Sequence, residues 1–190
     1  PAIVEPQAGF GFSLDLLGNT AIVGSPVLTG FVGVPDASTL LFSTSTGVPA
    51  VSLPPPLMGR NLAGFAVKLT ESHIVIGGPI AGEDRFGRVW VYSRATGILE
   101  HVLAASDATV ATGFGVSIDA DDQHVLVGAP FGTEAPARGG AAYLFDINTG
   151  TELAKFQRDT PEVGDEFGWD LRLAGDSAFI AAPFVGVGEA

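Results

Sequence analysis

Two adjacent carboxylates form the pattern in this sequence that could support acid–base chemistry. Asp165 and Glu166 are neighbours, and Asp159 precedes them in the same stretch. A pair of carboxyl groups can act as general acid and general base when one of them is withdrawn from water. Here the pair falls in a loop that leads into a predicted strand, where both groups are expected to be solvated. We therefore predict no catalytic role for them.

The histidines are the next residues whose chemistry deserves a test, as metal ligands or general bases. His73 and His124 each precede a proline at the same distance, and Thr20 and Ser177 occupy the equivalent places elsewhere in the chain. Equivalent places in successive repeats lie apart, so we do not expect the two imidazoles to share an ion. His101 lies in a predicted strand with no partner pattern. The sequence has no cysteine and no HExxH, GxSxG or phosphate-binding loop, so we predict no enzyme.

The composition limits the classes of partner. The 190 residues contain 9 Lys and Arg against 21 Asp and Glu, a formal net charge of −12. This charge disfavours binding to nucleic acids or to anionic membrane surfaces. No uninterrupted apolar run of roughly 18–20 residues occurs, so we expect no membrane insertion. The 26 glycines and 13 prolines accompany 46% hydrophobic residues, which indicates folded segments separated by turns rather than disorder.

Four segments of the chain align with one another. They read GFGFSLDLLGNTAIVGSP (9–26), GFAVKLTESHIVIGGP (64–79), GFGVSIDADDQHVLVGAP (113–130) and EFGWDLRLAGDSAFIAAP (166–183). Their final prolines are 53, 51 and 53 residues apart, at Pro26, Pro79, Pro130 and Pro183. A Thr-Gly pair recurs with nearly the same period, ending at Gly47, Gly97 and Gly150. A period of about 50 residues predicts one repeat domain over 1–190, with units near 9–60, 61–108, 109–162 and a partial unit over 163–190.

The apolar pattern inside each repeat has the period of strands. Phe114, Val116 and Ile118 alternate with small or polar residues, which predicts a half-buried strand. Further strands are predicted at 125–127, 141–145 and 152–156, separated by turn residues. Four antiparallel strands in about 50 residues are typical of a propeller blade. We predict an all-β β-propeller fold with about three and a half four-stranded blades, as an open arc or as part of a seven-bladed propeller.

The recurring residues have mechanical roles in this fold. We expect an aromatic ring to fill the wedge between neighbouring blades at Phe10, Phe65, Phe114 and Phe167. A glycine after the ring allows backbones to approach closely, at Gly11, Gly115 and Gly168. A proline ends the second strand without wasting a hydrogen-bond donor, at Pro26, Pro79, Pro130 and Pro183.

The remaining aromatic residues divide between core and surface. Trp90 alternates with Val89 and Val91 inside a predicted strand, which favours the core. Trp169, with Phe131 and Phe184 just after landmark prolines, could form a surface that stacks on sugars or contacts a protein. An apolar residue also follows the other two prolines, at Val27 and Ile80. This recurrence favours packing between blades first and ligand contact second.

The third repeat carries the fullest motif. Its Phe114-Gly115, Gly128-Ala129-Pro130 and Thr149-Gly150, with the segment 143–146 between them, resemble the FG-GAP repeat of integrin α-subunit propellers. The likeness to bacterial and other secreted FG-GAP repeat proteins is closer. The resemblance implies an extracellular or cell-surface β-propeller that serves adhesion or recognition.

Integrin-type FG-GAP repeats often carry a calcium loop of the form DxDxDG, and the resemblance makes Asp119, Asp121 and Asp122 its candidate ligands. The stretch lacks the glycine and the later ligands of that loop, and calcium takes six to eight oxygens. Glu83 and Asp84 form a second acidic pair, after Pro79. We expect no cofactor.

Because the sequence predicts three and a half blades, we also predict a partner. An open arc leaves strand edges and blade faces uncovered. The chain is expected to belong to a longer propeller or to associate with further copies of itself. Three functions remain open. They are a non-catalytic recognition or adhesion module that binds a protein or glycan through propeller loops, a structural subunit that assembles through blade edges into a filament or shell, and an accessory part of a polysaccharide-active enzyme.

Overall fold

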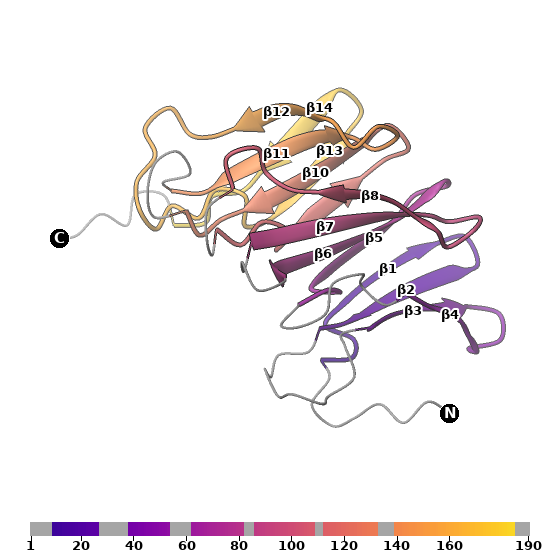
Figure 1. Cartoon of the computed structure of the whole chain (residues 1–190). Helices are drawn as coiled ribbons and strands as arrows, with labels where there is room; N and C mark the ends of the chain where they lie inside the picture. Colours follow the sequence, from indigo (N-terminus) through magenta and orange to yellow (C-terminus); the bar gives the residue numbers. More distant parts are fainter. Residues whose placement is uncertain are drawn as a thin grey trace.

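The strands of this protein form successive antiparallel sheets along the chain (Figure 1). A computed structural model describes residues 9–26, 38–53, 62–81, 86–108, 112–132 and 139–184, and within these ranges it contains strands and no helix. We call each sheet a blade and number the blades in chain order.

Three blades have four strands and the fourth has two. The first contains β1 (Ser13–Leu17), β2 (Thr20–Ser25), β3 (Ser38–Ser43) and β4 (Pro49–Leu53). The second contains β5 (Ala66–Leu69), β6 (His73–Ala81), β7 (Phe86–Ser93) and β8 (Leu99–Leu103). The third contains β9 (Ile118–Ala120), β10 (His124–Ala129), β11 (Ala141–Asp146) and β12 (Glu152–Phe156). The fourth consists of β13 (Leu171–Ala174) and β14 (Ser177–Ile180).

Each blade is an antiparallel meander whose strands pair in chain order. The hairpin between the third and fourth strands turns at Gly47, Gly97 and Gly150, whose φ angles are 67°, 69° and 70°. Residues with a side chain rarely adopt such φ angles, which explains why glycine recurs in the Thr-Gly pair. The predicted all-β fold, with three and a half blades, is confirmed.

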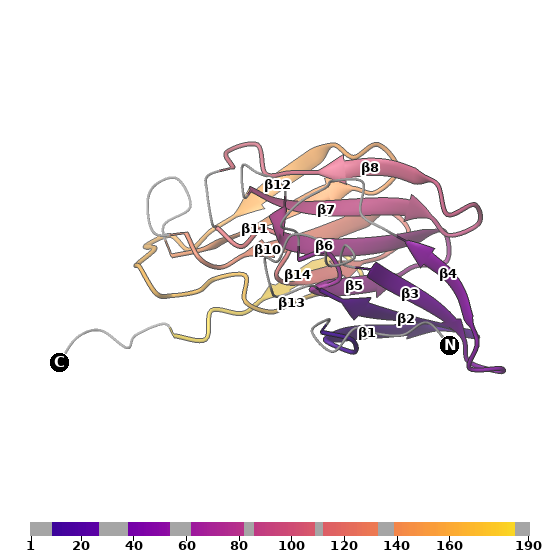
Figure 2. The same cartoon turned by 60° about the horizontal axis from the view of Figure 1, so that its bottom comes forward.

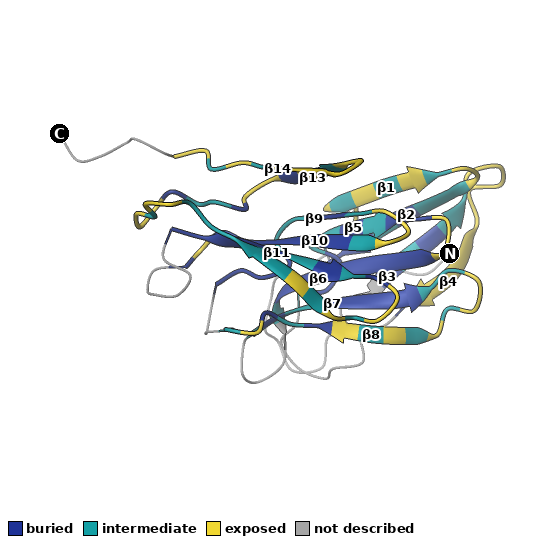
Figure 3. Cartoon of the chain, turned by 90° about the horizontal axis from the view of Figure 1, so that it is seen from above, coloured by how far each residue is buried: buried dark blue, intermediate teal, exposed yellow. Residues whose placement is uncertain are grey.

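The core lies between the blades rather than inside any one of them. We call the face toward the preceding blade the front face and the opposite one the back face. Ile22, Leu41 and Leu53 on the back face of the first blade share a buried cluster with Trp90 and Tyr92 on the front face of the second. A second cluster joins the second blade to the third, and a smaller one joins the third to the fourth. Figure 2 shows the sheets side by side, and Figure 3 shows that middle strands such as β6 and β10 are largely buried.

The first strand of each blade lies nearest the neighbouring blade's first strand. β5 contacts β1 and β2, β9 contacts β5 and β6, and β13 contacts β9 and β10. The four first strands thus follow one another along the inner side of the array, as they do in propellers. We call them the inner strands.

The backbone also corrects the alignment of the second repeat. Gly11, Gly64, Gly115 and Gly168 have φ angles of 84°, 88°, 93° and 95°. Each donates its N–H to the carbonyl oxygen at an equivalent place of the second strand, on Gly24, Gly77, Gly128 and Ala181. Gly64 is therefore the equivalent of Gly11, and the alignment of Phe65 with Phe10 and Phe114 is wrong by two residues. Phe65 corresponds to Phe12, and Ala63 takes the place of the buried ring.

Candidate functional site

The same turn precedes every inner strand and presents one apolar residue. Its closing hydrogen bonds run from Phe12 N–H to Gly9 O, from Phe65 to Leu62, from Val116 to Gly113, and from Trp169 to Glu166, at 2.9–3.1 Å. The donor residue is apolar in all four blades. The fold therefore sets a row of apolar side chains along one end of the inner strands.

Two aromatic pairs lie at this end of the inner strands, and we call them together the aromatic rim: Phe12 with Phe65, both from the row, and Trp169 from the row with Phe131, which follows Pro130. The rings of Phe12 and Phe65 have their centroids 4.5 Å apart across the first two blades. The rings of Phe131 and Trp169 meet edge to face at 5.8 Å across the last two blades. Phe12, Phe131 and Trp169 are exposed, and Phe65 is half-buried. Exposed rings in paired arrangements are the feature of the described surface best suited to contact a ligand.

The other aromatic candidates separate clearly. Trp90 is fully buried in the core. Phe184 is exposed after Pro183, and Phe131 follows the buried Pro130. A Cβ on Gly113 would collide with the ring of Phe131, so this ring packs tightly on the turn of its own blade. The rim is thus held rigidly at Phe131, which favours specific contact over loose association.

The predicted packing residues lie in different environments. Phe114 is buried, with its ring centroid 5.6 Å from that of Tyr143 and 5.9 Å from that of Phe145. Phe167 is half-buried, whereas Phe10 lies exposed at the front of the first blade. Among the remaining motif residues the buried ones are Pro26, Pro79, Pro130, Gly115 and Gly168, and the exposed ones are Gly11 and Pro183.

The three calcium candidates point to separate protein partners. Asp119 is buried, lies 3.0 Å from Lys68 Nζ, and accepts the N–H of Leu173 at 2.7 Å. Asp121 accepts the N–H groups of its own turn, at 2.8 and 2.7 Å. Asp122 accepts the N–H of Ser72 in the second blade at 3.0 Å. Within the described ranges, no three metal-ligating side chains gather, and Glu83 and Asp84 lie outside those ranges.

The histidines serve separate local contacts. His73 Nε2 lies 3.2 Å from a Glu100 carboxylate oxygen, and His124 Nδ1 lies 3.5 Å from Asp121. His101 Nε2 lies 2.9 Å from the carbonyl oxygen of Asn148 in the third blade. His101 therefore links the outer strand of one blade to the turn of the next.

The paired carboxylates form part of a closed loop. Asp165 is buried and accepts hydrogen bonds from Glu162 N–H at 2.8 Å and from Arg158 at 2.6 Å. The N–H of Glu162, and then the Arg158 guanidinium, hold the pKa of Asp165 below its usual range. Glu166 adopts a positive φ of 54°, which is uncommon for a residue other than glycine. Asp159 is exposed. The buried acid of this loop is thus held in its ionised form by the N–H of Glu162 and by Arg158, which suits structure rather than proton transfer.

One polar cluster was not predicted from the sequence. Asp107, after the last strand of the second blade, accepts hydrogen bonds from Tyr143 Oη at 2.7 Å and Lys155 Nζ at 2.6 Å. Burial pushes the pKa of Asp107 upward, but the bonds from Lys155 and Tyr143 outweigh it and keep the pKa below its ordinary value. The cluster fixes the connection between two blades. Its members are far apart in sequence and share no repeat position, so no local signal identifies them.

Successive four-stranded meanders that bury their cores between one another define an array of propeller blades. Residues 99–145, from the last strand of the second blade through the third strand of the third, match the family model described as FG-GAP repeat. These residues therefore match an FG-GAP repeat, in agreement with the motifs of the third repeat. No curated protein matches the sequence. In the part of the chain that the structure describes, no helix is long and apolar enough to cross a membrane.

Proposed function

We propose that this protein is a non-catalytic, extracellular recognition module that binds a protein or glycan through the aromatic rim. The carrying observation is that two aromatic pairs lie at one end of the inner strands with three of their four rings exposed, whereas the rings of Phe114, Tyr143 and Phe145 are buried between blades. FG-GAP repeats are typical of propeller-type binding modules on extracellular or surface proteins. Asp119, Asp121, Asp122, Asp165 and the three histidines are each engaged in structural contacts, which supports a binding rather than a catalytic role.

The rim supplies the chemistry that such a partner needs. Aromatic side chains bury large apolar areas at little cost in conformational entropy, and they stack on the apolar faces of sugars as readily as on protein side chains. The net charge of −12 repels strongly anionic partners at long range. We therefore expect a neutral or basic partner with an apolar patch.

The two tryptophans allow a direct test. Trp169 is 45% exposed and Trp90 is 0% exposed, so a ligand on the rim changes the fluorescence of Trp169 alone. We would screen a glycan array and a panel of purified extracellular proteins, and titrate each hit by tryptophan fluorescence. Replacing both Phe131 and Trp169 with alanine should weaken binding at least tenfold, as judged by a label-free assay such as calorimetry.

A matched control is the exposed Leu153 on β12, away from the rim. Leu153→Ala should bind like the wild type. Equal binding by the Phe131→Ala/Trp169→Ala protein and the wild type would exclude the rim as the binding surface.

A structural subunit is the second candidate function, and one observation favours it. The front face of the first blade and the back face of the fourth expose apolar residues that are buried elsewhere in the array. Assembly through these faces does not require the rim.

A further inference from the structure

Four charged residues occupy one equivalent place on the inner strands. Strand pairing sets Asp15 opposite Ile22, Lys68 opposite Val75, Asp119 opposite Leu126, and Arg172 opposite Phe179. All four lie on the back faces of their blades, because cross-strand neighbours share a face. Their charges alternate in sign along the array.

These residues form a continuous ladder across the blades. Lys68 Nζ lies 3.8 Å from the Asp15 carboxylate and 3.0 Å from that of Asp119. Arg172 Nε lies 3.9 Å from Asp119. Each acid has a further partner besides the cations. Asp15 also accepts a hydrogen bond from the N–H of Leu69, and Asp119 accepts one from the N–H of Leu173. Each interior member therefore meets an opposite charge on both sides.

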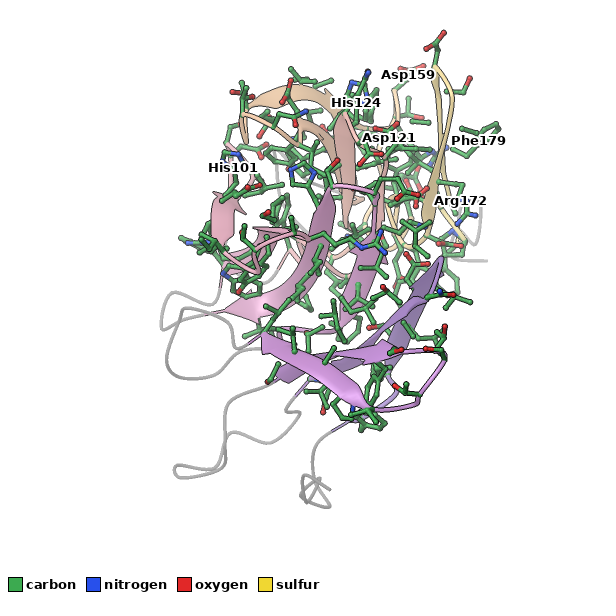
Figure 4. All side chains as sticks on the ribbon, turned by 90° about the vertical axis from the view of Figure 1, so that its right-hand side faces the viewer. His101, Asp121, His124, Asp159, Arg172 and Phe179 are labelled. Atoms are coloured by element: carbon green, nitrogen blue, oxygen red, sulfur yellow. The ribbon has the colours of Figure 1, made fainter. Side chains whose placement is uncertain are left out.

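The ladder ends at an uncovered back face. The Arg172 side chain is 71% exposed, and it projects outward with Phe179 from the fourth blade (Figure 4). Phe179 is 61% exposed, whereas its equivalents Ile22, Val75 and Leu126 are 0% exposed because the following blade covers them. Arg172 meets an acid on one side only among the described residues.

The opposite end of the array is uncovered in a complementary way. Leu14 on the front face of the first blade is 71% exposed, and its equivalent Val67 in the second blade is 7% exposed. Leu16 is exposed too, although its equivalent Leu69 is buried. In the second blade, the back face of the preceding blade covers the equivalent positions. Asp15, the first member of the ladder, lies on the opposite face of the same strand.

We propose that two copies of this chain associate head to tail, with the back face of the fourth blade on the front face of the first blade of a second copy. This contact sets Arg172 next to Asp15 of the second copy, and the alternation of charge continues unbroken across the junction. It also covers Phe179, Leu14 and Leu16 with apolar surface. Contact between two front faces would leave Phe179 and Arg172 uncovered.

Two residues make this junction weaker than the internal ones. A Cβ at Gly24, Gly77 or Gly128 would overlap a glycine carbonyl of the following blade, yet the equivalent residue in the fourth blade is Ala181. Ser13 and Ser117 donate hydrogen bonds to such carbonyl oxygens, at 2.8 and 2.7 Å, whereas the equivalent residue is Asp170 in the fourth blade. An alanine and an acid hold the second copy slightly away, so the association is reversible.

The absence of cysteine permits a clean cross-linking experiment. Single-cysteine proteins Leu14→Cys and Phe179→Cys are mixed under mild oxidation. We expect the mixed disulfide to form at least tenfold more than either symmetric product. Ile98→Cys, at an equally exposed apolar residue on a β7–β8 turn, is the control and should not cross-link to either. A symmetric Leu14 product in excess, or equal cross-linking by the control, overturns the proposal.

Sedimentation velocity over a concentration series gives an independent measurement. Arg172→Glu should weaken self-association at least tenfold, and Ala181→Gly should strengthen it. Because Arg172 and Ala181 are exposed, neither variant is expected to unfold. A single-chain mass at every concentration for both the wild type and Ala181→Gly overturns the proposal, as does unchanged association of Arg172→Glu.

Discussion

The interior of the blade array and its two outer faces differ in burial although they share the same strand pattern. Ile22, Val75 and Leu126 are completely buried, while Phe179 at the equivalent place has the largest side chain of the four and is exposed to solvent. The strands of a blade therefore do not bury its faces; only the next blade does. Stability in such an array comes from the interfaces between neighbours, and every uncovered face is a place where a partner can add to it.

Replacing the interblade aromatic ring should give the largest contrast between interior and outer face. Phe114→Ala should lower the free energy of unfolding by about 3–5 kcal/mol, because it opens a cavity beside Tyr143 and Phe145. Phe10→Ala, at the equivalent exposed residue, should cost less than about 1 kcal/mol. Urea unfolding followed by circular dichroism measures both. Equal losses would show that the first blade's ring is as well packed as the third's.

A methyl group added at the glycine contact should give the next largest effect. Gly128→Ala should lower the free energy of unfolding by about 3 kcal/mol, since the new Cβ overlaps the Gly168 carbonyl and the Ser117 hydroxyl. The reverse change at the outer face, Ala181→Gly, should alter it by less than about 1 kcal/mol in dilute protein. A tolerated Gly128→Ala would mean that the blades can slide apart without loss.

The charge ladder should be strong in its middle and weak at its end. Asp119→Ala should cost about 2 kcal/mol, because it leaves the N–H of Leu173 without its acceptor and removes a carboxylate from Lys68. Arg172→Ala should change the free energy of unfolding by less than about 0.5 kcal/mol.

Chelation by EDTA should leave the thermal midpoint of the wild type unchanged, because Asp119 binds Lys68. A lower midpoint in EDTA would indicate a metal.

The smallest effect concerns the Asp107 cluster and acid. Because the folded-state pKa of Asp107 is lowered, its contribution is present above the unfolded-state pKa of about 3.9 and is lost as the pH falls through the folded-state value. Tyr143→Phe should cost about 1 kcal/mol at neutral pH and reduce this acid dependence. Unfolding curves at a series of pH values measure it. An unchanged acid dependence would show that other carboxylates dominate.

Much of the fold follows from local sequence, whereas much of the site does not. Alternating residues such as Phe114, Val116 and Ile118 predict strands, and Thr-Gly pairs predict hairpin turns whose φ only glycine adopts easily. The second repeat was misaligned because Gly9-Phe10-Gly11-Phe12 contains the Gly-Phe pair twice, and only the backbone angle separates the two. Phe131 and Trp169 were identifiable from their places after landmark residues. Phe12 was not identified from the sequence. The signal that could have identified it is that an apolar residue follows the positive-φ glycine in every blade.

The ladder was beyond prediction because its members change from Asp to Lys to Asp to Arg along the array, whereas a sequence repeat is recognised by the recurrence of one residue type. Asp119 was a calcium candidate by pattern, but its place between Lys68 and Leu173 makes it a structural anion. By itself, the sequence determined the strands, the turns and the number of blades, since these depend on neighbours along the chain. The tertiary structure decided which equivalent residues are buried and which acids are paired, because those depend on the face of another blade.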